Sequence, residues 1–173
     1  LDAALEAGLR LVQVREAALD PERREGFARE VVRRVEACGG LVLINDDPAL
    51  ARRVGAHGVH LPTRSLMTLR ERPDCSWVGA SCHARAELEH AARLGLDYAL
   101  LGPLAPTASH PGAAGIGWAR FSEQASGLPM PVLALGGLVA ADMDTARNAG
   151  AHGIAAIRGA WAQTHNGQGP GVR

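Results

Sequence analysis

Lysine does not occur anywhere in this 173-residue chain, so all 18 of its Lys+Arg residues are arginine. Without lysine there is no Schiff base, no ammonium nucleophile and no phosphate-binding lysine of the Walker type. The 18 cations balance 18 Asp+Glu, and this formal charge of zero leaves no overall field that attracts nucleic acid or an anionic membrane. We therefore expect neither nucleic acid nor a membrane as a partner.

Cysteine and long apolar runs are also scarce. The three cysteines, an odd number at unpatterned spacing, argue against a disulfide framework and favour a reducing compartment. Charges or glycines interrupt every apolar stretch, so the sequence contains neither a transmembrane helix nor the apolar core of a signal peptide. These absences predict a soluble, cytoplasmic protein.

What the chain does contain is a recurring unit, in which an amphipathic Ala/Arg/Glu-rich stretch ends at a glycine and a short aliphatic run follows. Glycine suits the left-handed residue just past a helix end, and a nearly continuous run of Val, Ile and Leu is typical of a strand covered on both faces. The unit occurs at Ala7-Gly8-Leu9, Cys38-Gly39-Gly40, Val54-Gly55-Ala56, Leu94-Gly95-Leu96 and Ala149-Gly150-Ala151. It predicts repeated helix-to-strand connections.

Strands and helices are predicted to alternate along the chain. The predicted strands are Arg10–Val14, Leu41–Ile44, Gly58–Leu61, Trp77–Ser81, Tyr98–Gly102, Val132–Gly136 and Gly153–Ile157. The clearest helix covers Pro21–Ala37, where Asp20 is a suitable cap. Its predicted apolar face consists of Phe27, Val31, Val32 and Val35. Strict alternation requires a parallel sheet with right-handed crossovers, either closed as a (β/α)₈ barrel or open and doubly wound.

The length of the chain suits one domain. A complete barrel usually takes about 250 residues, and this chain opens inside a predicted helix, Asp2–Gly8, so we expect a first strand upstream of Leu1. We place the barrel domain at residues 1–161 and predict that the Gly/Gln/Asn/Pro-rich tail, residues 162–173, is disordered.

Polar side chains gather where the predicted strands end, which is where a parallel barrel builds its site. Asn45, Asp46 and Asp47 follow a predicted buried strand, and their oxygen atoms suit a Mg²⁺ ion that bridges to phosphate. Asp47, which precedes Pro48, also fits the cap of a helix, so two interpretations stay open for it.

The last two strands end at glycines. In barrels, the loops at these positions often bind phosphate through backbone N–H groups, because a backbone without side chains approaches an anion closely. Gly136-Gly137 and Arg158-Gly159 lie there, and Arg158 adds a charged donor. The alternative is a pair of tight turns.

His60, His83 and His110 also fall near strand ends, with Cys82 nearby. Three converging histidines would suit a zinc hydrolase, although no HExxH or CxxC spacing accompanies them. Cys82 is either a nucleophile or a core side chain. The remaining histidines that fall in loops or on a helix face are expected to be solvated: His57, His90 and His152.

Six segments, in order along the chain, resemble the thiamine phosphate synthase family and its relatives, the TenI-type thiazole tautomerases. They are VQVRE at 12–16, LINDD at 43–47, GVHL at 58–61, VGASCH at 78–83, GPLAPT at 102–107 and ALGG at 134–137. The resemblance implies a (β/α)₈ TIM barrel, here without its first strand. In the synthase, a pyrimidine pyrophosphate loses pyrophosphate to the nitrogen of a thiazole phosphate with the help of Mg²⁺.

Carried over residue by residue, the resemblance assigns catalytic roles to Arg15, Asn45 and Ser81 and a Mg²⁺-binding role to Asp46. The positions that it assigns to substrate and phosphate binding are Gln13, Thr107, Ser109, His110, Gly136, Gly137, Ile157 and Arg158.

Three positions depart from the family pattern. Ala17 and His110 stand where the family has lysines, and Ser65 stands where it has a second Mg²⁺-binding aspartate. Loss of one electrostatic stabiliser of this kind costs about 10² to 10³ in rate. Three functions therefore stay open: a synthase-type transferase, a TenI-like tautomerase, and a catalytically degenerate ligand-binding or regulatory module.

The stretches 106–112 and 156–161 look most like the barrel that is fused to Nudix (MutT-type) hydrolases in some bacterial proteins. That resemblance implies an N-terminal Nudix hydrolase domain in the same chain as the barrel.

Overall fold

The structure is a computed structural model that describes residues 1–106 and 115–156. Within these ranges seven strands form one parallel sheet. The strands are β1 (Leu11–Val14), β2 (Leu41–Asn45), β3 (Gly58–Leu61), β4 (Trp77–Cys82), β5 (Tyr98–Leu101), β6 (Val132–Leu135) and β7 (Gly153–Ala155). The seven predicted strands are confirmed, with small differences at their ends.

Helices fill the connections between the strands. They are α1 (Asp2–Glu6), α2 (Pro21–Glu36), α3 (Pro48–Val54), α4 (Thr63–Leu66), α5 (Arg85–Arg93), α6 (Gly117–Ala125) and α7 (Met143–Asn148), with a 3₁₀ turn η1 (Ala140–Asp142) before α7. Among the helices that the structure describes, none is long and apolar enough to cross a membrane.

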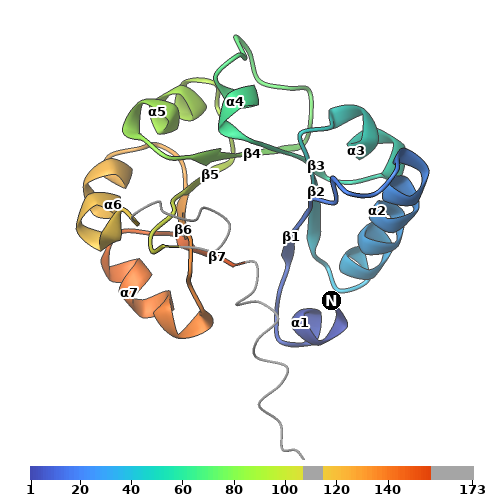
Figure 1. The fold of residues 1–173 in the computed structure, drawn as a ribbon, viewed down its shortest axis with the longest axis horizontal. Coiled ribbons are helices and arrows are strands. Elements are labelled where there is room, and N and C mark those ends of the chain that lie inside the picture. The colour runs from blue at the N-terminus through green and yellow to red at the C-terminus, as the bar shows by residue number, and fades with distance from the viewer. Residues whose placement is uncertain (107–114, 157–173) are drawn as a thin grey trace, which may run out of the picture.

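The order of the strands decides between the two predicted architectures. A doubly wound sheet reverses its strand order at a switch point. Here every strand pairs with the next one in the sequence, and the sheet curls with helices α2 to α7 outside the curve (Figure 1). Across residues 1–106 and 115–156 the curl stays open between β1 and β7. The fold is thus a TIM-barrel-like half-barrel, which confirms the predicted barrel class.

In the predicted helix-to-strand units, a glycine in the left-handed conformation lies between the helix and the strand. Gly55 follows α3 with φ of 73°, and its N–H group donates to the carbonyl of Arg52. The other glycines of these units have positive φ as well: Gly8, Gly39, Gly95 and Gly150. This conformation strains any residue with a Cβ atom, so these glycines favour the end of the helix that precedes each of them.

The two faces of the sheet pack differently. The outer face joins the helices in the main hydrophobic core, which includes Ile44 and Val59 of the sheet and Leu50 and Phe121 of the helices. The inner face carries a smaller apolar cluster, formed by Leu43, Tyr98 and Leu100 with Leu133, Leu135 and Ala155 packed against it. The remainder of the inner face is polar and is described below.

Helix α2 confirms the predicted helix and corrects its apolar face. The carboxylate of Asp20 accepts a hydrogen bond from the backbone N–H of Arg23 at 2.9 Å, as a cap does. Phe27 is 43% exposed, whereas Ala28 is buried. Counting from Ala28, the buried valines follow at positions i+3, i+4 and i+7, and Phe27 lies at the edge of this stripe.

Two histidines that were expected in solvent hold strand starts together. The Nδ1 atom of His57, just before β3, accepts a hydrogen bond from the N–H of Val42 at 3.2 Å. The Nδ1 atom of His152, just before β7, accepts one from Val132 at 3.4 Å. At the amino ends of the strands, the His57 and His152 rings satisfy backbone donors that have no strand partner. The third histidine expected in solvent, His90, has its Nε2 atom 3.2 Å from the carbonyl oxygen of Leu66. His57 and His90 are half-buried, so only His152 is exposed as predicted.

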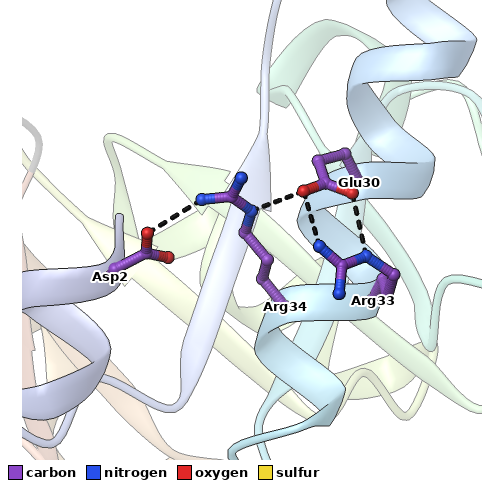
Figure 2. A network of polar contacts seen from close by, with 4 residues as sticks. All are labelled: Asp2, Glu30, Arg33 and Arg34. Carbon is purple, nitrogen blue, oxygen red and sulfur yellow. Dashed lines mark hydrogen bonds and ion pairs between the residues drawn. The ribbon is translucent and has the colours of Figure 1, made fainter.

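A charged network ties α1 to α2. Figure 2 shows Arg34 between two carboxylates, with 2.8 Å to Oδ2 of Asp2 and 2.6 Å to Oε1 of Glu30. Arg33 binds the same glutamate, at 2.7 Å to Oε1. Hydrogen bonds from Arg33 and then Arg34 lower the pKa of Glu30 to about 2. All four side chains are well exposed, so the network orients α1 more than it stabilises the fold.

Candidate functional site

The carboxyl ends of β1 and β2 are joined by an amide pair. Nε2 of Gln13 donates to Oδ1 of Asn45 at 2.9 Å. The register that pairs Val14 with Ile44 places Arg15 and Asn45 at the same level of the sheet. The structure therefore brings Gln13 into contact with Asn45, 32 positions later in the sequence, and places a third predicted site residue, Arg15, at their level.

Asp46 follows β2 in an unusual conformation. Its φ is 55°, in the left-handed region that few residues other than glycine adopt. Its N–H donates to the carbonyl of His60 at 2.9 Å, which ties the end of β2 to β3. Oδ2 of its carboxylate lies 3.2 Å from an amino nitrogen of Arg64, the second residue of α4. The local backbone thus holds this carboxylate at the end of the sheet.

Asp47 has a structural role, which decides between its two predicted interpretations. Its Oδ1 accepts from the N–H of Leu50 at 2.8 Å and caps α3, and its Oδ2 pairs with Arg24 at 3.0 Å. Both oxygen atoms are occupied by contacts within the fold. Asp47 is therefore a cap that also joins α2 to α3.

His60 is the centre of a buried hydrogen-bond chain. The residue is 1% exposed, with Nδ1 at 2.8 Å from the hydroxyl of Tyr98 and Nε2 at 2.8 Å from the hydroxyl of Ser81. Burial, and after it the charge of Arg15, lowers the pKa of His60 to about 4. The ring is thus neutral at pH 7, and it donates to one hydroxyl while it accepts from the other. It orients Ser81 at the mouth of the half-barrel.

A glycine makes this chain of hydrogen bonds sterically possible. The sheet pairs His60 with Gly79 and Gly79 with Tyr98, so the three residues share one row on the inner face. A Cβ atom at Gly79 would lie 2.2 Å from the Tyr98 ring. The ring of Tyr98 lies over Gly79, and this position lets the tyrosine hydroxyl contact His60. Sequence reasoning missed Tyr98, although it is the one tyrosine of the chain and begins a predicted strand.

Ser81 is held from its backbone side as well. Its carbonyl oxygen accepts a hydrogen bond at 2.7 Å from Oγ1 of Thr63, the first residue of α4. Thr63 is a second residue that sequence reasoning missed, and its only signal is a hydroxyl directly after the GVHL strand and Pro62. The serine is half-buried, so it is fixed in place yet reachable.

The predicted histidine triad finds no support where the structure describes it. Both ring nitrogens of His60 bind hydroxyl groups, and Nδ1 of His83 lies 2.6 Å from the carbonyl oxygen of Gly102. Among residues 1–106 and 115–156, no three His, Cys, Asp or Glu side chains are placed to hold a metal ion. His110 lies outside these ranges.

Cys82 is a core residue and not a nucleophile of the site. It is 1% exposed and belongs to the main core. Burial, and after it the charge of Glu87, raises the pKa of its thiol to about 12. A cysteine nucleophile acts as a thiolate and needs a lowered pKa.

A Mg²⁺ ion fits the described residues poorly. Asp46 offers one carboxylate, but its Oδ2 already faces a guanidinium, and the amide oxygen of Asn45 already accepts from Gln13. Ser65, on α4, offers a hydroxyl where a carboxylate would bind the ion more strongly. The donor set therefore matches a hard divalent cation only weakly.

The double glycine after β6 is required by close packing. Gly136 has φ of 117°, and a Cβ atom there would lie 2.7 Å from the Leu104 nitrogen. Gly137 has φ of 71° and is exposed. A Cβ atom there would lie in a tight contact, 3.2 Å from the Cβ atom of Ala105. The tight-turn interpretation accounts for both glycines, and phosphate binding by Gly137 stays a prediction.

Five of the predicted site residues lie outside the described residues, so no contact tests them. They are Thr107, Ser109, His110, Ile157 and Arg158.

Comparisons with known proteins agree with this architecture. The sequence profile of the family described as thiamine monophosphate synthase matches residues 1–160. A thiamine-phosphate synthase of Thioalkalivibrio sulfidiphilus is 37% identical over 166 residues, which cover 94% of this chain and 79% of that protein. A thiamine-phosphate synthase of Chromobacterium violaceum is 38% identical over 161 residues, covering 91% and 77%.

A solved structure carries the same fold. The thiamine phosphate pyrophosphorylase of Pyrococcus furiosus superposes with a TM-score of 0.77 at 23% identity, over 90% of this chain and 76% of that one. At this identity the superposition supports the fold, while the profile and the two synthases above carry the family assignment. The chain belongs to the thiamine monophosphate synthase family.

Proposed function

We propose that this chain takes part in thiamine biosynthesis by binding a pyrimidine diphosphate and a thiazole phosphate and joining them into thiamine phosphate. The relatives that support this are named thiamine-phosphate synthases. The observation that carries the proposal is the polar half of the inner face. There the ends of four neighbouring strands present Gln13, Asn45, Asp46, His60 and Ser81.

The polar half suits a flat, nitrogen-containing ring. The Gln13–Asn45 amide pair offers both donors and acceptors, and the neutral His60 and Ser81 add a directional pair beside it. Leu100 and Leu135 on the other half of the inner face supply apolar contact area. Pockets for small ligands combine apolar walls with a few fixed polar groups in this way.

The reaction needs cations near the leaving group and does not need a nucleophile from the protein. The thiazole nitrogen forms the new C–N bond while the diphosphate leaves with the electrons of the C–O bond, so the enzyme must stabilise negative charge on the leaving group. Arg15 lies at the level of Asn45, and its charge adds to the effect of burial in lowering the pKa of His60. In this proposal Arg15 binds the diphosphate.

Incubation of the protein with a pyrimidine diphosphate and a thiazole phosphate, with detection of thiamine phosphate by chromatography, tests the proposal. We expect product formation that falls by at least about 10²-fold in Arg15→Ala, since it loses a transition-state cation. Arg93→Ala removes an exposed arginine of α5 and serves as the control with unchanged turnover. Absence of product under all conditions would exclude the synthase activity.

The second candidate function is that of a binding module without turnover. Ala17, Ser65 and His110 favour it, because two cations and one carboxylate of the family pattern are missing. Such a module would be stabilised by thiazole phosphate, thiamine phosphate or pyrophosphate in a thermal-shift assay, yet form no product. At about 100 times Kd, a ligand adds roughly 2.7 kcal/mol to the free energy of unfolding. A TenI-like tautomerase would instead convert a thiazole phosphate alone.

We propose that Mg²⁺ dependence, where present, is weak and rests on Asp46. Ser65→Asp together with His110→Lys should raise the affinity for pyrophosphate in the presence of Mg²⁺, since a second carboxylate and a cation return to the pattern of the family. Calorimetry measures this, and an unchanged affinity in the double variant would show that these positions lie outside the site.

We propose that Gly137 and Arg158 hold the phosphate of the thiazole. Gly137 is exposed at the carboxyl end of β6, where a backbone N–H can meet an anion. Gly137→Asp and Arg158→Glu should abolish binding of thiazole phosphate while pyrophosphate still binds. Unchanged thiazole-phosphate binding would place this phosphate elsewhere.

Three points of domain organisation stay predictions: the barrel boundary at residue 161, the disordered tail, and an N-terminal Nudix hydrolase domain in the same chain. A TenI-like activity is also a prediction. Limited proteolysis followed by mass spectrometry of the protein from its natural source would test the boundary and the attached domain together.

A further inference from the structure

Arg64 faces the one carboxylate that the end of β2 presents. Its amino nitrogen lies 3.2 Å from Oδ2 of Asp46, and its neighbour Ser65 carries no charge. The side chain of Asp46 is 24% exposed, whereas that of Arg64 is 82% exposed. The carboxylate is therefore held by its surroundings, and the guanidinium approaches it from the solvent side.

This ion pair does little for the stability of the fold. Exposed pairs contribute little, because solvent screens them and two side chains lose rotamer freedom. A guanidinium carries five N–H donors in a planar fork, and the Asp46 contact engages one of its two amino groups. The remaining edge of the fork suits the oxygens of a phosphate group.

Without a bridging cation, Asp46 would repel a diphosphate at the end of the sheet. A metal ion solves this problem in many phosphate sites by binding carboxylate and phosphate at once. The donor atoms near Asp46 fit a divalent ion poorly, as described above. A guanidinium between carboxylate and phosphate supplies the same sequence of charges, negative, positive and negative.

We infer that Arg64 is the cation that links Asp46 to the diphosphate of the substrate, so that this site binds diphosphate without a divalent metal ion. The inference rests on the proposed function, which supplies a diphosphate-bearing substrate. Arg64 and Arg15 then approach the diphosphate from α4 and from the end of β1.

Calorimetric titration of the purified protein with inorganic pyrophosphate, first in EDTA and then in excess Mg²⁺, tests the inference. We expect binding in EDTA, weakened at least about tenfold in Arg64→Ala, because a charged hydrogen-bond donor to the anion is lost. Arg64→Lys keeps the charge but loses the fork, and should bind with intermediate affinity. Arg70→Ala, which removes an exposed arginine six residues further on, is the matched control with unchanged affinity.

The outcomes separate this inference from the function on which it rests. Binding that requires Mg²⁺ overturns the role of Arg64 and leaves the proposed synthase intact. No binding of pyrophosphate in either buffer overturns both. Equal weakening by Arg64→Ala and Arg70→Ala would reduce the effect to general surface charge and overturn the inference. Circular dichroism melts should coincide for all variants, since both arginines are exposed.

Discussion

The inner face of the half-barrel has two halves that are built from the same strand geometry and differ in chemistry. Over β1 to β4 it carries Gln13, Asn45, His60 and Ser81, which bind one another or Tyr98 through side-chain hydrogen bonds. Over β5 to β7 it carries leucine and alanine side chains, which only pack and which Leu43 of β2 joins. Tyr98 belongs to both halves, with its ring in the apolar cluster and its hydroxyl on His60.

The difference shows how the sheet separates stability from binding. Apolar side chains stabilise through the area that they remove from water, whatever their exact partners. Polar side chains inside a barrel are stable only when each finds a partner of suitable geometry, so they are fixed in direction. The apolar half thus closes the core, and the polar half presents oriented groups to a ligand.

The junction between the halves should be the most sensitive point. In Gly79→Ala the new methyl group would overlap the Tyr98 ring, which must move away from His60. We expect the free energy of unfolding to fall by about 3 to 4 kcal/mol, from overpacking and a buried group left without its partner. Urea denaturation measures this.

Gly26→Ala, in the middle of α2, is the matched control. No atom lies within 4 Å of a Cβ there, and alanine favours helix, so this variant should gain about 0.5 to 1 kcal/mol. An equal loss in both variants would mean that crowding at Gly79 is not the cause.

The polar half should make stability depend on pH. The pKa of His60 is about 4 in the folded chain against 6.5 when unfolded, so between these values the unfolded state binds more protons. Stability should therefore be complete above pH 6.5 and fall by roughly 3 kcal/mol as the pH drops to 4, at about 1.4 kcal/mol per unit of pKa. Urea denaturation at several pH values measures the slope. In His60→Asn this part of the slope should vanish, and an unchanged slope would assign it to other groups.

Substitutions on the two halves should change different quantities: the free energy of unfolding on the apolar half and ligand binding on the polar half. Leu100→Ala should lower the free energy of unfolding by about 2 to 3 kcal/mol, because a side chain that is 8% exposed leaves a cavity. Asn45→Ala should change stability little, because its amide pair is partly exposed, yet it should weaken substrate binding. Thermal melts with and without pyrophosphate compare the two. Equal ligand-induced shifts in Asn45→Ala and the parent chain would remove Asn45 from the site.

The network of Figure 2 should show the smallest effect. Arg34→Ala removes the ion pair with Asp2 that joins α1 to α2, together with the pair that Arg34 forms with Glu30 within α2. Since these side chains are exposed, we expect a small decrease in Tm that disappears at high salt. A large, salt-independent decrease would mean that α1 is part of the cooperative core.

Much of the fold could be predicted from the sequence, because its signals are local. The glycines after α1, α2, α3, α5 and α7 and the aliphatic runs that follow encode helix-to-strand connections within a few residues, and their alternation implies a parallel sheet. Asp20 and Asp47 are caps that neighbouring residues reveal. Phe27 was placed wrongly because an edge position of a helix stripe depends on what packs against it.

The candidate site was predictable in position and not in its contacts. Parallel strands end at one rim, so Gln13, Asn45 and Asp46 could be placed together from the sequence alone. The choice between a closed or curled barrel and a doubly wound sheet, the path of Tyr98 across Gly79 to His60, and the pairing of Arg64 with Asp46 were decided only by tertiary structure. Backbone conformation follows from neighbouring residues, whereas strand order, shared rows and ion pairs depend on which distant segments the folded chain sets side by side.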